Sequence, residues 1–476
     1  MERSVKIIFI FMVLVSSSLS IEAQNAIDAS ELRLRHDIGA LANDSMFGRE
    51  AGYSSEYKAA KFIEKAFSKC RLTPINKETG SYLKAFDFGD YTYKKAELWI
   101  NNKQYRTGVD FGAVAGSADI ENWSGETAFI EERNGLENLK TNNSYKGKAV
   151  VLDMKGNEHN SSPGIWDIVS YIHECIARGA EAILLFNASH NDFGNRLFNA
   201  DSMPSFPVPV LYITHKVRVD LNNNSGATCK ISVEIKRKRP AAHNVIGFMD
   251  NGAQKTIMIG GHFDHVGTPG VKDPIAGDPN IHNGADDNAS GAAAVLELAR
   301  WITARKGLRY NYLFIAFSAE EKGLFGSWNF CNSNDFKLFN IAWMLNLDMV
   351  GRLGWSGKNR VDVLGLASAR EWKKILKKVD HTGLKLTKLG GGAAFSDHYP
   401  FRVHKVPFIY FTTGLEHEYH KPVDDPELIN YKGEAVILDY IERLIVEAER
   451  SPEPEYKKIG LFRDIGTVIK MFILKM

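Results

Sequence analysis

The sequence predicts an α/β protein in which a mostly parallel mixed sheet is sandwiched by helices and a second, mixed α/β unit is inserted. From about residue 241, short apolar stretches alternate with helical patterns, the order that builds a largely parallel sheet covered on both faces. Between residues 108 and 240, a different mixture of short strands and helices reads as a self-contained block. The length of 476 residues also exceeds that of one ordinary domain.

Each element of the main unit follows from its hydrophobic pattern. Continuous apolar runs predict the strands, at 256–259, 312–317, 343–347, 361–364 and 406–411. Apolar residues recurring at spacings of three and four predict the helices, at 292–305, 369–379 and 433–448. In such a sheet the functional site lies beyond the carboxyl ends of the strands.

The inserted block has its own series of expected strands and helices. Its elements are expected at 148–153, 165–178, 182–186 and 208–213. Alternation of Ile231, Val233 and Ile235 is typical of an edge strand. These patterns divide the mature chain into four parts, which are 24–107 (start of the main unit), 108–240 (insertion), 241–450 (remainder of the main unit) and 451–476 (C-terminal tail).

Residues 1–23 are expected to be a signal peptide. Arg3 and Lys6 flank the apolar run from Ile7 to Val15, and Ala23 is a suitable cleavage point. The apolar run is shorter than the roughly 20 residues that a helix needs to cross a bilayer. The sequence therefore predicts an exported protein, secreted or periplasmic, with no stable membrane insertion after cleavage.

The charge balance gives no sign of a nucleic-acid partner. Lys and Arg number 59 against 57 Asp and Glu, a formal net charge of +2. A nucleic-acid-binding protein usually carries a pronounced basic excess or patch. We therefore expect no nucleic acid among the partners, and nothing in the sequence indicates an oligomeric state.

Acid and imidazole groups gather in five short segments that follow apolar strands or open a helix. The segments are Gly260–His265, Asn283–Gly291, Phe317–Glu321, Asn346–Met349 and Tyr419–Asp424. A single Asp at such a place is commonly a helix cap or a turn former. Together, however, the segments supply imidazoles and a surplus of carboxylates without thiolates, which suits Zn²⁺, Mn²⁺ or Co²⁺.

In their order of His, Asp, Glu-Glu, Asp and His, these segments resemble the M28 family of zinc peptidases, which includes bacterial and vacuolar aminopeptidases and glutamate carboxypeptidases. The resemblance covers most of the mature chain. Phe47-Gly48-Arg49 looks like the family's N-terminal segment, and residues 108–240 resemble the protease-associated (PA) domain that many members carry as an insertion.

The resemblance implies two Zn²⁺ ions per chain and a role for each residue. The implied metal ligands are His262, Asp287, Glu321, Asp348 and His420. Asp287 would bridge both metals, because two close cations need a shared carboxylate between them. Glu320 matches the general base, Asp264 would hydrogen-bond the second ring nitrogen of His262, and Tyr419 is a candidate for stabilising the oxyanion. The other imidazoles, including His265, are expected to lie outside the ligand set.

The implied activity is hydrolysis of peptide substrates from one end, with the N-terminal end expected. Three alternatives stay open: a carboxypeptidase of the same family, a glutaminyl cyclase, and a non-catalytic, receptor-like homologue. A serine hydrolase is not expected, because the sequence has no Gly-x-Ser-x-Gly segment. A thermolysin-like enzyme is not expected either, because it has no His-Glu-x-x-His.

Overall fold

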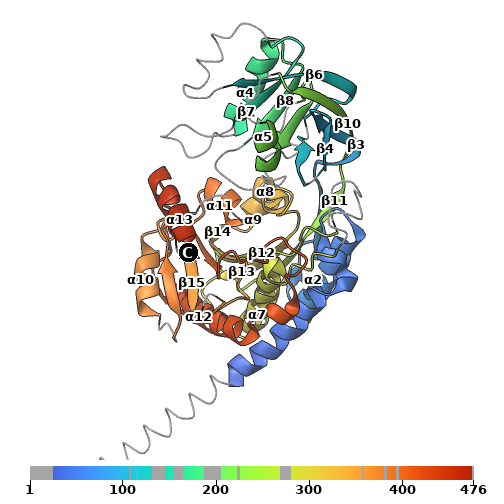
Figure 1. The fold of residues 1–476 in the computed structure, drawn as a ribbon. Helices are drawn as coiled ribbons and strands as arrows, with labels where there is room; N and C mark the ends of the chain where they lie inside the picture. The colour runs from blue at the N-terminus through green and yellow to red at the C-terminus, as the bar shows by residue number, and fades with distance from the viewer. Residues whose placement is uncertain are drawn as a thin grey trace, which may run out of the picture. The chain divides into compact units, whose positions relative to one another are not determined.

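The computed structural model describes residues 25–107, 109–114, 116–130, 145–153, 165–186, 205–221, 226–268, 280–355, 357, 359–379, 383–392 and 396–473. The segment expected to be a signal peptide lies outside these residues. The chain divides into two compact units (Figure 1). The first comprises Met1–Phe86, Ala241–Gly267 and Ile281–Met476, and the second comprises Asp87–Pro240 and Thr268–Asn280.

The first unit is built on a mixed sheet. In its described part the sheet has nine strands, in the order β1-β11-β13-β12-β14-β17-β15-β16, with β2 also paired to β11. Their bounds are β1 Thr73–Pro74, β2 Leu83–Asp87, β11 Ala241–Met249, β12 Thr256–His262, β13 Asn311–Phe317, β14 Ile341–Leu347, β15 Arg360–Leu364, β16 Lys385–Lys388 and β17 Phe408–Thr412. The central strands β13, β12, β14 and β17 are parallel, so their carboxyl ends meet at one edge.

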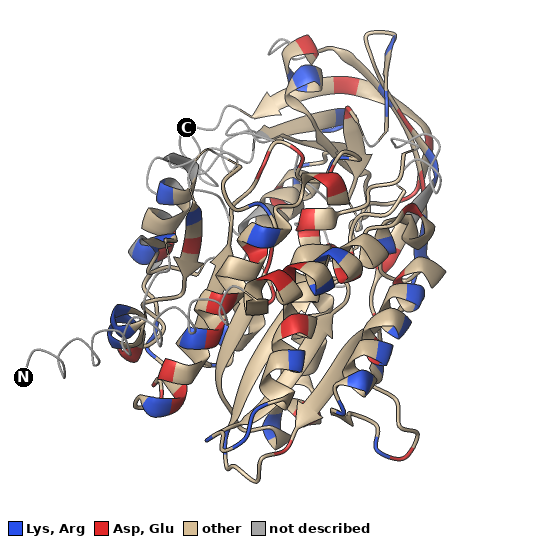
Figure 2. Ribbon diagram, turned by 90° about the horizontal axis from the view of Figure 1, so that it is seen from below, with Lys and Arg blue, Asp and Glu red and all other residues tan. Residues whose placement is uncertain are grey.

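Helices cover both faces of this sheet. Besides a helix at 25–41, they are α2 (Ser54–Lys69), α7 (Gly291–Thr303), α8 (Phe325–Asn332), α9 (Asn334–Leu338), α10 (Glu371–Lys378), α11 (His398–Val403), α12 (Tyr431–Arg450) and α13 (Leu461–Ile473), with short helical turns η1 (Asp44–Arg49), η3 (Ala285–Ser290) and η4 (Pro426–Leu428). Acidic and basic residues are interspersed along the helices (Figure 2). Among the described residues, no helix is both long enough and apolar enough to cross a bilayer.

Alternating strand residues divide the interior of the first unit into two cores. Ile257 and Ile259 of β12 pack in one core with α2, α7, α10 and α12. Met258 lies in the other, with aromatic side chains such as Phe330 of α8 and Phe401 of α11. This is the arrangement expected when both faces of a largely parallel sheet are buried.

The second unit has its own mixed sheet. In its described part the sheet has eight strands, in the order β4-β3-β10-β6-β7-β8-β9-β5. The strands are β3 Asp90–Ile100, β4 Lys103–Tyr105, β5 Phe111–Ala113, β6 Ile120–Ile130, β7 Lys148–Asp153, β8 Ala182–Phe186, β9 Val210–Ile213 and β10 Thr228–Lys238, with helices α4 Ile165–Ala177 and α5 His215–Leu221. Ala149 and Val151 face one core of this unit, and Val150 and Leu152 face the other.

Two expectations about the second unit differ from the structure. The unit begins at Asp87 instead of 108, because β3 and β4 are strands of its sheet. The segment around Ile231–Ile235 is not an edge strand. It belongs to β10, which lies between β3 and β6. The alternation predicts a strand, and a strand is present, but the neighbours of a strand are set by segments far away in the sequence.

Candidate metal centre

The candidate site lies where the parallel strands of the first unit end. His262 is the last residue of β12, and Asp348 directly follows β14. Glu320 and Glu321 lie in the turn after β13, and His420 lies in the loop between β17 and α12. Because the carboxyl ends of these strands share one edge of the sheet, segments distant in the sequence converge there.

A first group of side chains that could hold a metal ion comprises His262, Glu320 and Asp348, all of them buried. Nε2 of His262 lies 3.5 Å from Oδ1 of Asp348 and 3.9 Å from Oε2 of Glu320. The same nitrogen lies 3.4 Å from Oδ1 of Asp287. An ion held by His262, Asp348 and Asp287 would therefore have the Glu320 carboxylate beside it.

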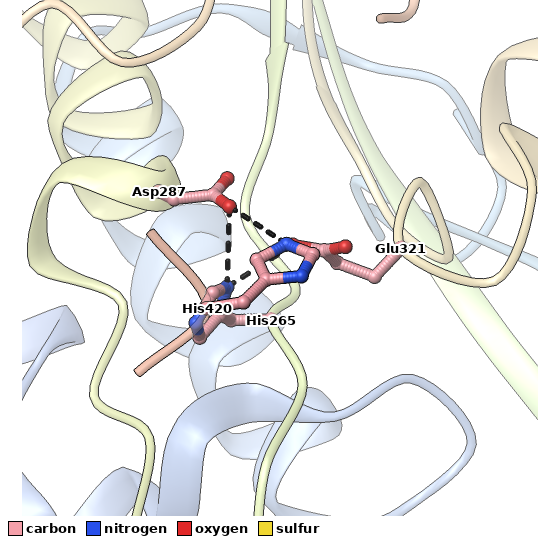
Figure 3. Close-up of side chains that lie close together, drawn as sticks. All are labelled: His265, Asp287, Glu321 and His420. Atoms are coloured by element: carbon pink, nitrogen blue, oxygen red, sulfur yellow. Dashed lines mark hydrogen bonds and ion pairs between the residues drawn. The ribbon is translucent and has the colours of Figure 1, made fainter. Parts of the chain in front are cut away.

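A second group comprises His265, Asp287, Glu321 and His420 (Figure 3). Nε2 of His420 lies 3.0 Å from Oε1 of Glu321 and 3.1 Å from Oδ2 of Asp287. Nδ1 of His265 lies 3.1 Å from the same Glu321 oxygen and 3.8 Å from Oδ2 of Asp287. The ligand atoms of the group all lie within 4.8 Å of one another.

Asp287 connects the two groups. Its Oδ1 faces His262 and its Oδ2 faces His420. The backbone of its segment is held by Asp424, whose carboxylate accepts hydrogen bonds from the N–H groups of Asp286 and Asp287. One carboxylate thus presents an oxygen to each group, as a bridging ligand between two metal ions must.

The electrostatics of the cluster fit divalent cations. Burial and then the Glu321 carboxylate raise the pKa of Asp287 to about 8. Burial favours a low pKa for His420, but Glu321 and Asp287 outweigh it and raise this pKa to about 10. Oδ2 of Asp287 is buried and lies 3.1 Å from Nε2 of His420. A buried set of carboxylates and imidazoles that retains protons at neutral pH offers donor atoms from which a cation would displace those protons.

Asp264 is placed differently from the expectation. Nδ1 of His262 lies 3.2 Å from the backbone carbonyl oxygen of Asp264 but 3.8 Å from its carboxylate. The carboxylate instead accepts hydrogen bonds from the backbone N–H groups of Glu320, at 3.1 Å, and Glu321, at 3.3 Å. The carboxylate therefore positions the Glu-Glu turn, and the main chain of Asp264 faces the ring of His262.

His265 lies inside the second group, which differs from the expectation that it lies outside the ligand set. Its side chain is fully buried and points toward Glu321 (Figure 3). One signal was available in the sequence, because His265 follows His262 by three residues just beyond the end of the same strand. Tyr419 lies next to the group, and its ring stacks on that of His420 with centroids 3.8 Å apart.

Comparisons with known proteins agree with this fold. An aminopeptidase from Aneurinibacillus sp. strain AM-1 superposes with a TM-score of 0.68 at 22% identity, covering 90% of this chain and 96% of that one. A zinc aminopeptidase from Bacillus subtilis superposes with a TM-score of 0.62 at 21% identity, covering 91% and 97%. The fold is thus that of solved aminopeptidases, a mostly parallel mixed sheet between helices.

Sequence comparison adds the family. Residues 244–445 match the family described as Peptidase family M28. Aminopeptidase YwaD from Bacillus subtilis is 27% identical over 348 residues, which are 67% of this chain and 70% of that protein. An aminopeptidase from Pseudomonas aeruginosa is 29% identical over 180 residues, and the match spans 37% of this chain and 31% of that protein. The similarity to peptidase family M28 thus covers residues 244–445, the part of the chain that carries every candidate metal ligand.

Proposed function

We propose that this protein is an exported exopeptidase with two zinc ions that removes amino acids from the N-terminal end of peptides. The observation that carries the proposal is the position of Asp287 between two groups of buried imidazoles and carboxylates, with Glu320 beside the first. The N-terminal preference is supported by the relatives described as aminopeptidases. Export rests on the pattern of residues 1–23.

The proposed metal ligands divide between the two groups. His262 and Asp348 would hold one zinc ion, Glu321 and His420 would hold the other, and Asp287 would contribute one oxygen to each. When bound, the two ions would lower the pKa of water toward about 7 and polarise the peptide carbonyl. The set contains no thiolate, which agrees with a hydrolytic zinc site of imidazoles and carboxylates.

Glu320 is the proposed general base. It would accept a proton from the attacking water and deliver that proton to the leaving amine. Asp264 is a positioning residue in this proposal, because its carboxylate holds the backbone N–H groups of Glu320 and Glu321. Tyr419 is proposed to donate a hydrogen bond to the tetrahedral oxyanion, and its ring packs on that of His420.

The second unit is proposed to be a PA domain inserted into the peptidase domain. It has a sheet and cores of its own. The two groups of possible metal ligands that the described residues contain both lie in the first unit. We therefore assign the chemistry to the first unit alone.

The first test compares zinc-loaded wild type with Glu320→Gln on two matched peptides, one acetylated at its N-terminus and one amidated at its C-terminus. The wild type should cut only the peptide with the free N-terminus. Glu320→Gln keeps the size of the side chain but cannot accept the proton, so kcat should fall by about 10²–10⁴-fold while zinc content, measured by mass spectrometry, stays unchanged. Glu78→Gln, the same change at an exposed position, serves as the control and should retain full activity.

Each other outcome selects an alternative. Cleavage of only the peptide with the free C-terminus would make the protein a carboxypeptidase with the same site. Cyclisation of a peptide that begins with Gln, without hydrolysis of either test peptide, would make it a glutaminyl cyclase. A wild type that retains less than one zinc per chain and cuts nothing would be a receptor-like homologue.

A further inference from the structure

His265 is an imidazole in the second group to which the mechanism above gives no role. Its side chain is fully buried, and its ring lies edge-on to that of His420, with centroids 5.5 Å apart and an interplanar angle of 72°. Nδ1 points at the oxygens of Glu321 and Asp287 that also face His420 (Figure 3). The two imidazoles thus approach the same pair of carboxylates.

The distances in this group match the edges of a tetrahedron around one ion. Four ligand atoms at about 2.0–2.2 Å from a tetrahedral zinc ion lie about 3.3–3.6 Å from one another. His420 Nε2 lies 3.0 and 3.1 Å from the oxygens of Glu321 and Asp287. His265 Nδ1 lies 3.1 and 3.8 Å from the same two oxygens. These four nitrogen–oxygen distances are close to those in a tetrahedral zinc site, and one ligand atom from each of the four residues lies within 4.8 Å of the others.

A plain hydrogen bond from His265 to Glu321 explains less of this geometry. It accounts for the contact at 3.1 Å but not for the position of the ring between two carboxylates and a second imidazole. The backbone also makes room for the ring at this place. A Cβ atom on Gly284 would lie only 2.4 Å from Cγ and Cδ2 of His265, and the φ angle of this glycine is +58°, so a side chain there would displace the imidazole.

We propose that His265 is a fourth protein ligand of the second metal ion. This inference rests on the proposed function. The second site then has the four protein ligands His265, Asp287, Glu321 and His420, one more than the first site. The first site has three protein ligands, His262, Asp348 and Asp287, and an open position beside Glu320, which is the coordination of a catalytic zinc site. The two ions therefore differ in affinity, and the second site fills first.

The test uses the full-length protein reconstituted with one and with two equivalents of zinc. Zinc X-ray absorption at one equivalent should show two imidazoles per ion in the wild type, those of His265 and His420. In His265→Asn it should show one imidazole. The amide of Asn preserves a hydrogen-bond donor near Nδ1 but supplies no imidazole. His215→Asn, the same change at an exposed position of the second unit, should match the wild type.

Zinc retention gives an independent readout. In dialysis against graded free-zinc buffers, the two sites of the wild type should fill at two separate zinc concentrations. In His265→Asn, the zinc concentration that half fills the tighter site should rise by at least about tenfold. Circular dichroism checks that the variant is folded. If the variant does not fold, the X-ray absorption data on the wild type still test the proposal. A single imidazole in the wild type at one equivalent would overturn the proposal, as would equal retention by both proteins. Failure of the wild type to bind zinc at all would instead overturn the proposed function.

Discussion

Arg49 is a fully buried cation that contacts main-chain carbonyl groups. Its guanidinium donates hydrogen bonds to the carbonyl oxygens of Leu41, Phe263, Asn283 and Gly284, at 2.6–2.9 Å. Burial lowers its pKa to about 10, and the Asp264 carboxylate counteracts this, so the side chain stays charged at neutral pH. Two of the segments that it holds carry candidate ligands, because Phe263 follows His262 and Gly284 precedes the turn of Asp287.

The donor geometry of Arg49 leads to a prediction about stability. In Arg49→Lys, a single ammonium group with three donors replaces the planar fork, so some of these buried carbonyl oxygens lose their partner. We expect the free energy of unfolding to fall by about 2–4 kcal/mol, measured by urea denaturation at fixed zinc concentration. Arg35→Lys, at an exposed position, should change it by less than about 0.5 kcal/mol. Equal effects of the two changes would show that the buried fork is dispensable.

Among the elements, strands and helices with strong local patterns are predictable from the sequence. The apolar run predicted at 256–259 is part of β12, and the helix predicted at 433–448 is most of α12. Strand pairing is not predictable from local patterns, because β10 pairs with β3 and β6 across more than a hundred residues of sequence. The place of His265 among the candidate ligands is not predictable for the same reason, since its neighbours Glu321 and His420 come from other loops.

Helix α12 contains an acid that should make stability depend on pH. Burial, with Asp439 and Glu297 nearby, raises the pKa of Glu442 to about 8. A carboxyl group with a raised pKa in the folded state binds more protons there than in the unfolded chain. The stability that the protonated Glu442 contributes is therefore lost as the pH rises from the pKa of this group in the unfolded chain toward its folded-state pKa of about 8.

Glu442→Gln removes this titration. Compared with the wild type, the variant should be more stable at pH 9 by about 1–2 kcal/mol, and the difference should shrink to near zero at pH 5. Urea denaturation of both proteins across this pH range, at fixed zinc concentration, measures it. Glu78→Gln, at an exposed position, should follow the wild type throughout. A difference that does not vary with pH would mean that Glu442 is ionised in the folded protein as it is in the unfolded chain.

At the scale of the whole molecule, the longer segment of the second unit, Asp87–Pro240, begins and ends with strands that are neighbours in its sheet. Asp90 at the start of β3 and Lys238 at the end of β10 are register partners in an antiparallel pair, and Lys238 Nζ lies 3.3 Å from the Asp90 carboxylate. The two ends of residues 87–240 therefore lie side by side within the second unit. The sequence predicts the end of the second unit near residue 240, close to where the structure has it, but predicts its start at 108 instead of 87. The start is predicted too late because the pairing of β3 with β10 is visible only in the three-dimensional structure.

This topology predicts that residues 87–240 fold without the rest of the chain. The fragment contains the eight-stranded sheet and the cores on both of its faces, so it should unfold cooperatively in a thermal scan followed by circular dichroism. The matched control is a fragment of residues 108–240, which lacks β3 and β4. That fragment leaves the long strand β10 as an unpaired edge and removes Leu98 and Ile100 from one core, so it should aggregate or stay unfolded. A cooperative transition in the shorter fragment but not in the longer one would mean that the boundary belongs at 108 and that β3 is part of the peptidase domain.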